Sequence, residues 1–175
     1  MNLVSTPGWL TTGRRWASDI QGPVRTTPYP ATLRRQWGLD LCPAQLYAIL
    51  RLRQDVFVVE QNSVYSDLDG RDLEQGTRHF WLEADGSHDP LAYLRLLEEL
   101  DGTFRIGRVV TARMARGRGF SRRLVQAALV DVGSAPCVLD AQTYVVDFYA
   151  SFGFVPEGAE FIDDGIPHLR MRRTP

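Results

Sequence analysis

The pattern of apolar and polar positions divides the chain into an irregular beginning and a regular remainder. Residues 1–32 contain four prolines and show no apolar periodicity. Such a segment does not bury enough surface to order itself, so we expect a flexible tail. After it, apolar residues recur at strand or helix spacing to the end of the chain. We therefore predict a single folded domain over residues 33–175.

The spacing of apolar residues within this domain predicts short strands mixed with helices. Strands are expected at 33–41, 79–84, 91–98, 104–111, 137–141, near Phe161 and at 168–172, and helices at 43–54, 119–132 and 145–152. Asp101-Gly102 predicts a tight turn between two of the strands, and the polar, acidic stretch 60–78 predicts a long loop. A hairpin meander followed by a β-α-β crossover is typical of a mixed α/β (α+β) domain.

The composition narrows the class of protein. Of the 175 residues, 44% are hydrophobic and 23% are charged, and the net charge is −1, which gives no general attraction to nucleic acid or to an anionic membrane. No apolar run reaches the roughly 20 residues that a membrane span needs. The two cysteines, Cys42 and Cys137, fit neither a disulfide framework nor a paired-ligand zinc site. We predict a reduced, cytoplasmic protein without a metal.

Residues 106–124 (IGRVVTARMARGRGFSRRL) place a glycine-rich turn between a β-branched run and a helix. Glycine lets the backbone approach a ligand closely, and the unpaired N–H groups at a helix start attract anions. This order predicts a cradle for the pyrophosphate of a nucleotide-like cofactor. The alternative is a helix entry that uses glycine for a tight turn and leaves its arginines in solvent.

The absence of lysine excludes one familiar kind of nucleotide site. All twenty basic residues are arginine, so the chain has no P-loop lysine and no side-chain amine for Schiff-base chemistry. A dinucleotide-binding fold is a more distant alternative. Asp140 stands roughly where the ribose-binding acid of that fold belongs, but three strands of antiparallel type precede the glycine turn.

Arg116-Gly117-Arg118-Gly119-Phe120-Ser121 resembles the acyl-CoA pyrophosphate loop, R/Q-x-x-G-x-G/A, of the GNAT superfamily of N-acetyltransferases. The last position of this pattern is Gly or Ala, and Ser121 departs from it. Further segments resemble the ElaA-like branch of this superfamily: Leu52-Arg53, VFVVEQ (56–61), SDLDGRD (66–72), Ala141-Gln142, FYASFGF (148–154) and DDGIPH (163–168). The resemblance covers about residues 33–173, and several motifs in one order are more specific than the loop alone.

The resemblance implies a fold, a co-substrate and a binding site. The fold is a GNAT-type mixed, mostly antiparallel twisted sheet flanked by helices, with a cofactor cleft between its two central strands. Acetyl-CoA is the implied co-substrate. Its pantetheine arm pairs with exposed strand backbone, which requires the strand at 137–141 to diverge from the strand at 104–111. The residues expected to bind it are Val109, Val110, Thr111, Arg116, Gly117, Arg118, Gly119, Phe120, Ser121, Arg122, Gln142 and Tyr149.

The implied reaction is direct transfer of an acetyl group to a primary amine of a small molecule or a peptide. The residues after position 35 carry a net charge of −5, which suits a cationic acceptor. The resemblance implies that Tyr149 is the general acid near the cofactor sulfur and that a backbone N–H near Thr111 is the oxyanion donor. The alternative is that Tyr149 packs under the sheet with its aromatic neighbours.

The general base is open among several residues. The candidates for the base are Glu60, at the end of an apolar run, His79 and His168, with Asp69 and Asp72 behind them. The residues expected to bind the acceptor are Arg53, Glu60, Asp69 and His168. A satisfied structural histidine is an alternative for His79. A cap, or a salt bridge to Arg53, is an alternative for Glu60.

Two other functions remain open. An acyl-homoserine-lactone-type synthase is one, because Leu52-Arg53 followed by VFVVEQ resembles that group as well. A non-catalytic acyl-CoA-binding module that keeps the cradle without transfer chemistry is the other. In every case we predict no nucleic-acid or membrane partner, and a monomer or a homodimer.

Overall fold

A computed structural model describes residues 30–175. The expected tail therefore lies outside the described residues, except at its end, where Ala31 and Thr32 already belong to the first strand. That strand thus begins two residues before the expected domain boundary.

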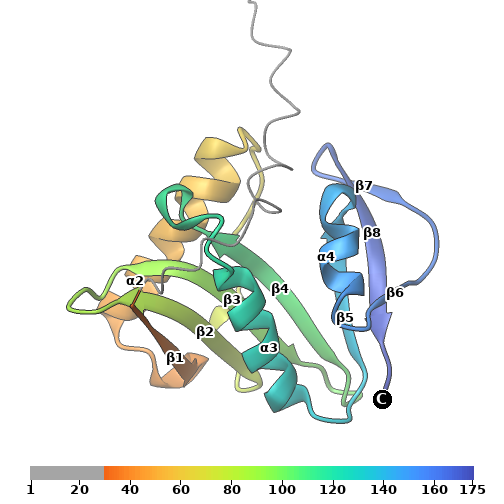
Figure 1. The fold of residues 1–175 in the computed structure, drawn as a ribbon, viewed down its shortest axis with the longest axis horizontal. Helices are drawn as coiled ribbons and strands as arrows, with labels where there is room; N and C mark the ends of the chain where they lie inside the picture. Colours follow the sequence, from red (N-terminus) through yellow and green to blue (C-terminus); the bar gives the residue numbers. More distant parts are fainter. Residues whose placement is uncertain (1–29) are drawn as a thin grey trace, which may run out of the picture.

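The described residues form one eight-stranded sheet (Figure 1). Its strands are β1 (Ala31–Trp37), β2 (Thr77–Ala84), β3 (Pro90–Glu98), β4 (Phe104–Thr111), β5 (Cys137–Gln142), β6 (Val155–Pro156), β7 (Phe161–Asp163) and β8 (Ile166–Arg173). The order is β1-β2-β3-β4-β5-β8-β6, with β7 on β8. Every pairing is antiparallel except the central one between β4 and β5. The sheet is thus mixed and mostly antiparallel, which confirms the expected fold class.

Helices cover both faces of the sheet. They are α2 (Pro43–Arg53), continued by the π-helical segment η2 (Gln54–Glu60), then α3 (Phe120–Val132) and α4 (Val146–Ala150). Short 3-10 turns lie at η1 (Gly38–Asp40), η3 (Arg71–Leu73), η4 (Arg113–Ala115) and η5 (Thr143–Val145). Figure 1 shows α3 crossing the front of the sheet and α4 lying over β5 and β8.

The alternation of side chains along the strands gives each face its own core. On β3, Leu94 and Leu96 belong to the large cluster that includes α3, whereas Tyr93 belongs to a second cluster with Ile49 and Leu52 of α2. The helix α2 begins where the sequence predicts, because Pro43 occupies its first turn and the Gln45 side chain accepts from the Cys42 N–H at 3.0 Å.

The central strands separate soon after they pair. β4 and β5 form a ladder only at Phe104↔Cys137 and Arg105↔Val138, as the implied cofactor cleft requires. A bulge bends β4 at the same place, because Arg95 pairs with Gly107 but Tyr93 pairs with Val110. The bulged residue Arg108 has a positive φ of 53°. The sheet is therefore open from the middle of β4 onward.

Several element boundaries differ from the sequence prediction, and the short strand β6 was not predicted. The first strand ends at Trp37, because Gly38 turns the chain against the backbone of Asp72, where a Cβ would clash. The helix predicted at 43–54 continues to Glu60, although its β-branched valines disfavour helix; packing of Val56 into the second core overrides that preference. The helix predicted at 145–152 is shorter and spans Val146–Ala150.

Candidate active site

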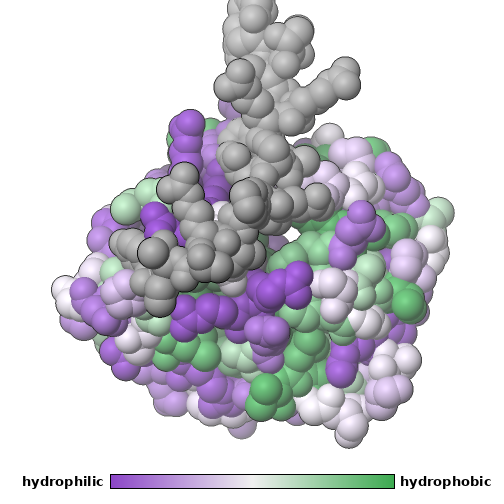
Figure 2. All heavy atoms as spheres, in the orientation of Figure 1, coloured by the Kyte–Doolittle hydropathy of each residue, from purple (hydrophilic) through white to green (hydrophobic). Residues whose placement is uncertain are grey.

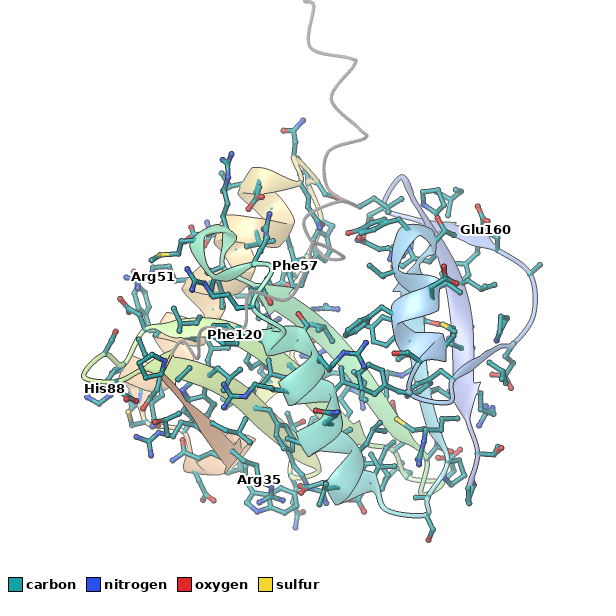
Figure 3. All side chains as sticks on the ribbon, in the orientation of Figure 1. Arg35, Arg51, Phe57, His88, Phe120 and Glu160 are labelled. Atoms are coloured by element: carbon teal, nitrogen blue, oxygen red, sulfur yellow. The ribbon has the colours of Figure 1, made fainter. Side chains whose placement is uncertain are left out.

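A cavity of about 910 Å³ occupies the opening between β4 and β5. Its walls come from both faces of the sheet: the glycine turn, α3 and α4 on one face, and η2, the 61–71 loop and the β7–β8 hairpin on the other. Figure 2 shows hydrophobic residues along the strip between α3 and α4, with hydrophilic residues on either side. In Figure 3, Phe120 marks the start of α3 and Phe57 lies near the neighbouring end of β4; both line the cavity.

The predicted cofactor residues all line this cavity. Both glycines of the turn have positive φ, 70° at Gly117 and 74° at Gly119, which glycine adopts without strain. Gly119 caps α3 without any side-chain hydrogen bond, and the first turn of α3 contains no acidic residue. A Cβ at either glycine would meet no atom within 4 Å, so the backbone faces open space. This arrangement fits an anionic group held by backbone amides.

Ser121, which departs from the family pattern, has a clear structural role. Its hydroxyl lies 2.9 Å from the hydroxyl of Thr111, so the two share a hydrogen bond. The bond joins the end of β4 to the first turn of α3 across the cavity wall. A serine at this position therefore fastens the cradle to the strand along which a pantetheine arm is expected.

Glu60 is not placed as a base. Its carboxylate accepts from Arg116 at both oxygens, with Nη1–Oε1 at 2.7 Å and Nη2–Oε2 at 2.9 Å. Arg116 also donates from Nε to the Thr111 carbonyl at 3.2 Å. Glu60 itself does not line the cavity. These contacts favour a positioning role for the Glu60 carboxylate, toward the first arginine of the glycine turn, over its predicted roles as a base or an acceptor-binding group.

Tyr149 is buried in the cavity wall on α4. Its ring stands edge-on to Phe148 at 5.0 Å and to Phe154 at 6.2 Å between centroids. Burial raises the pKa of the phenol above its ordinary value of 10, so the hydroxyl stays protonated. Tyr144, which is 39% exposed in the same wall, also has a pKa raised by burial. Sequence reasoning missed this second tyrosine, which the β5–α4 connection brings beside the first.

His79 is a structural histidine. It is fully buried, its Nε2 donates to the Asp72 carbonyl at 2.8 Å, and its Nδ1 accepts from the Tyr93 hydroxyl at 2.8 Å. Burial lowers the pKa of the imidazole. Because both ring nitrogens are occupied and the residue does not line the cavity, its surroundings favour the structural alternative for His79 over the predicted catalytic role.

Arg53, which the sequence predicts to bind the acceptor, does not line the cavity. It is fully buried and pairs with Asp67 at 2.9 Å and with Asp72 at 2.5 Å. It is one member of a closed ring of three arginines and three aspartates, in which each side chain contacts two of opposite charge. In order, the ring runs Arg53, Asp67, Arg108, Asp69, Arg95, Asp72 and back to Arg53. The three aspartates come from the SDLDGRD segment.

The acidic loop is therefore held in place by ion pairs to arginines of three other elements: α2, β3 and β4. Asp69, predicted to bind the acceptor, does line the cavity. Hydrogen bonds from Arg95 and from the Arg71 N–H keep the pKa of Asp69 below its usual range despite its partial burial, so Asp69 remains ionised. Arg95 and Arg108 were not anticipated; lone arginines within apolar strands, facing an aspartate-rich loop, were the available signal.

His168 lies at the far wall of the cavity, opposite Gln142 in the β5–β8 ladder. Its Nδ1 lies 2.9 Å from the carbonyl of Ile166. A carbonyl only accepts, so Nδ1 carries the hydrogen in the neutral ring and Nε2 carries the lone pair. The ring stacks on Phe161 at 5.9 Å between centroids. The cavity thus brings together His168, Asp69, Gln142 and Tyr149 from four separate segments.

No helix within residues 30–175 is long and apolar enough to cross a membrane. No group of three or more His, Cys, Asp and Glu side chains in that part of the chain is arranged to hold a metal ion.

An acetyltransferase (GNAT) domain family matches residues 53–175, which include the glycine turn and both walls of the cavity. The chain belongs to the GNAT acetyltransferase family. Among curated proteins, this GNAT protein is 55% identical over 145 residues to a UPF0039 protein of Mycobacterium tuberculosis, covering 81% of this chain and 92% of the relative. It is 39% identical over 142 residues to protein ElaA of Escherichia coli, covering 77% and 90%.

Solved structures agree with this assignment. A crystal structure of an acyl-CoA N-acyltransferase from Pseudomonas aeruginosa matches with a TM-score of 0.76 and 39% identity, over 82% of this chain and 99% of that one. The crystal structure of Escherichia coli ElaA matches with a TM-score of 0.76 and 36% identity, over the same shares. The protein is therefore an ElaA-like acyltransferase of the GNAT family. A CoA-dependent acyl-homoserine lactone synthase, at 16% identity and a TM-score of 0.65, shares the fold alone.

Proposed function

We propose that this GNAT protein is an acyl-CoA-dependent N-acetyltransferase that moves an acetyl group from acetyl-CoA to a primary amine of a small molecule or a peptide. The observation that carries the proposal is the continuity of the cavity. It runs from the glycine turn at the start of α3, past Thr111 and Tyr149, to the charged wall on the opposite face of the sheet. A co-substrate and an acceptor thus have access to one opening from two sides.

The glycine turn and the first turn of α3 are the proposed pyrophosphate site. Backbone amides from Gly117 to Arg122 supply the hydrogen bonds, and the arginines of this segment supply positive charge. Arginines at a helix start are unfavourable toward the helix dipole. Their presence in the first turn of α3, without an acidic residue, supports an anionic guest there.

The divergence of the central strands supports a site for the pantetheine arm. Beyond Arg105 the edge of β4 is not paired with β5, so backbone groups near Val109 and Thr111 are accessible from the cavity. An amide-containing arm lying along that edge extends the sheet in the manner of an added strand. The acetyl group then lies beside Thr111, with a nearby backbone N–H as oxyanion donor.

Tyr149 is the proposed general acid. In direct transfer the amine nitrogen attacks the thioester carbonyl carbon, a C–N bond forms, and the C–S bond breaks. The departing thiolate takes a proton from the Tyr149 hydroxyl and leaves as the thiol. The raised pKa of Tyr149 supports this role, because the proton is present at neutral pH.

His168 is the proposed group that accepts the proton lost by the amine, directly or through a water molecule. Of the basic candidates, Glu60 is held by Arg116, His79 is buried, and Asp69 belongs to the ring of ion pairs. His168 lines the cavity and carries its lone pair on Nε2, because Nδ1 is tied to a carbonyl.

The test is CoA release from acetyl-CoA in the presence of a panel of primary amines, with the products identified by mass spectrometry. We expect release that depends on the amine, and an acetylated amine as product. Tight CoA binding without release on any amine would favour an acyl-CoA-binding module instead. An N-acylated lactone among the products would favour the acyl-homoserine-lactone-type synthase. If neither acetyl-CoA nor longer acyl-CoAs raise the melting temperature, the proposal is wrong.

A further inference from the structure

The ring of ion pairs exposes only one of its edges to the cavity. Among its arginines, the exposed side-chain fraction is 0% for Arg53, 3% for Arg95 and 24% for Arg108. Among its aspartates, the exposed fraction is 6% for Asp67, 10% for Asp72 and 28% for Asp69. Arg108 and Asp69 are thus the most exposed members of the ring at the cavity, and Arg95 lines the cavity beside them while remaining largely buried.

Arg108 occupies an unusual backbone position. It is the extra residue of the β4 bulge, at the point where β4 leaves β5, and its φ of 53° is a conformation that side chains other than glycine, asparagine and aspartate rarely adopt. Such strain persists where the surroundings enforce it and is concentrated at functional sites. The bulge directs this arginine to the acceptor side of the opening, three residues before Thr111.

The guanidinium of Arg108 retains hydrogen-bonding capacity. Within residues 30–175 its hydrogen bonds leave from Nη2 alone, to the Asp67 carbonyl at 3.0 Å and to Asp69 at 3.3 Å. Its Nε lies near Asp67 without hydrogen-bond geometry. The Tyr65 ring lies 5.9 Å from the guanidinium centre and covers part of it. The orientation of the Arg108 guanidinium is thus fixed, while its Nη1 is available to donate a hydrogen bond to a ligand.

Asp69, by contrast, has little capacity left. Its two oxygens accept from both terminal nitrogens of Arg95, from the Arg71 N–H and from Arg108. A ligand at this edge therefore meets a donor rather than an acceptor. The two neighbouring carboxylates of the ring repel a doubly charged phosphate more than a singly charged carboxylate, so the edge favours the smaller charge.

We propose that Arg108 is a specificity-determining residue that binds the carboxylate of the acceptor, and that the acceptor is accordingly an amine that also carries a carboxylate, as amino acids do. This inference rests on the proposed acetyl transfer, since it names the class of amine that the same cavity accepts. The Nη1 of this guanidinium can donate a charge-assisted hydrogen bond to a carboxylate, and a bond of this kind orients the amine that the same molecule carries.

The experiment compares two acceptors that differ only in the carboxylate: an amino acid and its carboxamide, screened over several side chains with acetyl-CoA. In the unmodified protein we expect a higher kcat/KM for the amino acid. In Arg108→Asn the ratio of the two kcat/KM values should fall about 10- to 100-fold, through a higher KM for the amino acid. Comparing ratios cancels the difference in basicity between the two amines. Asparagine tolerates the left-handed backbone, so the bulge is kept.

Two control variants and the binding of CoA complete the experiment. Arg172→Gln removes an arginine paired with Glu157 outside the cavity and should keep the original ratio. Arg105→Gln removes another arginine of the cavity wall; if it abolishes the preference and Arg108→Asn does not, the assignment to Arg108 is wrong. The CoA dissociation constant and the melting temperature of each variant are measured alongside.

The outcomes separate this inference from the proposed function. Equal acetylation of amino acids and carboxamides by the unmodified protein overturns the carboxylate site and leaves the acetyl transfer standing. No CoA release with any amine overturns both. A preference for the amino acid that disappears in Arg108→Asn, with CoA affinity retained, supports the inference.

Discussion

Glu60 and Arg116 form a two-point ion pair, at 2.7 and 2.9 Å, between residues 56 positions apart in the chain. The pair joins the end of the π-helical segment η2 to the first residue of the glycine turn. π-helical turns are rare in proteins, but those that occur are often found at functional sites. Here the segment places Val56 and Phe57 in the cavity wall and Glu60 against Arg116, so one element supports both the proposed acceptor side and the proposed CoA side.

Glu60→Gln distinguishes this positioning role from catalysis as a base. Loss of a half-buried ion pair should loosen the glycine turn and raise the dissociation constant of CoA about 3- to 10-fold, which corresponds to about 1 kcal/mol. The value of kcat should stay within about threefold. Calorimetric titration with CoA and steady-state kinetics measure the two effects. A loss of kcat of about a hundredfold at unchanged CoA affinity would restore Glu60 as a base.

Tyr149→Phe removes the proposed acid without changing the packing of the ring. We expect kcat to fall about a hundredfold, because general acid catalysis contributes at least that much, while CoA affinity stays within about twofold. Since burial raises the pKa of Tyr149, kcat of the unmodified protein should show no decline from its ionisation between about pH 7 and 9. Tyr144→Phe is the matched control from the same wall. A larger loss in Tyr144→Phe would transfer the role to that residue.

Gly117→Ala tests the backbone cradle. At a φ of 70° an alanine is strained by about 1 kcal/mol or more, and its Cβ projects into the space where a pyrophosphate is expected. We expect the dissociation constant of CoA to rise about tenfold or more. Gly102→Ala is matched, because Gly102 also has a positive φ, 80°, and open surroundings but lies in the β3–β4 turn. It should lower stability to a similar degree and leave CoA affinity unchanged; equal CoA affinity in both variants contradicts the cradle.

Asp72→Asn tests the ring of ion pairs as a stabilising element. Asp72 is buried and contacts both Arg53 and Arg95. Removing its charge leaves two buried guanidinium groups short of a partner, so the free energy of unfolding should fall by about 3–5 kcal/mol. Urea denaturation measures it. The exposed pair of Glu157 and Arg172 is the comparison, and Glu157→Gln should change stability by less than about 1 kcal/mol.

His79 predicts a dependence of stability on pH. Burial lowers its pKa below the 6.5 of an exposed histidine, so the unfolded chain binds a proton that the folded chain does not. Stability should therefore decrease as the pH falls below about 6.5, by up to about 1.4 kcal/mol per pH unit from this group. Urea denaturation between pH 7 and 5 should show a shallower loss in His79→Gln than in the unmodified protein. Equal slopes would mean that His79 is not the source.

Local features of the fold were predictable because they depend on near neighbours in the chain. Pro43 marks the start of α2, Asp101-Gly102 marks the β3–β4 turn, and the two glycines of the RGRG segment mark the start of α3. The order of the motifs along the sequence likewise indicates the family, and with it the fold class. The π-helical extension of α2 was not predicted, because packing of Val56 into the core outweighs a local preference against helix.

The roles of the charged side chains depend on the tertiary structure. Glu60, His79 and Arg53 have the residue types of a base or a substrate ligand, and only the partners that folding brings to them, Arg116, Tyr93 and the ring aspartates, remove them from that role. Arg108 becomes a candidate binding residue only because a bulge in β4 turns it toward the opening.

The sequence by itself therefore determined the family, the fold class and most of the elements, because these depend on motifs and on near neighbours in the chain. The tertiary structure decided which charged side chains form ion pairs with one another and which face the cavity. Electrostatic partners are chosen by distance in space, and here they lie 41 and 56 residues apart in the chain for Arg108 with Asp67 and for Arg116 with Glu60.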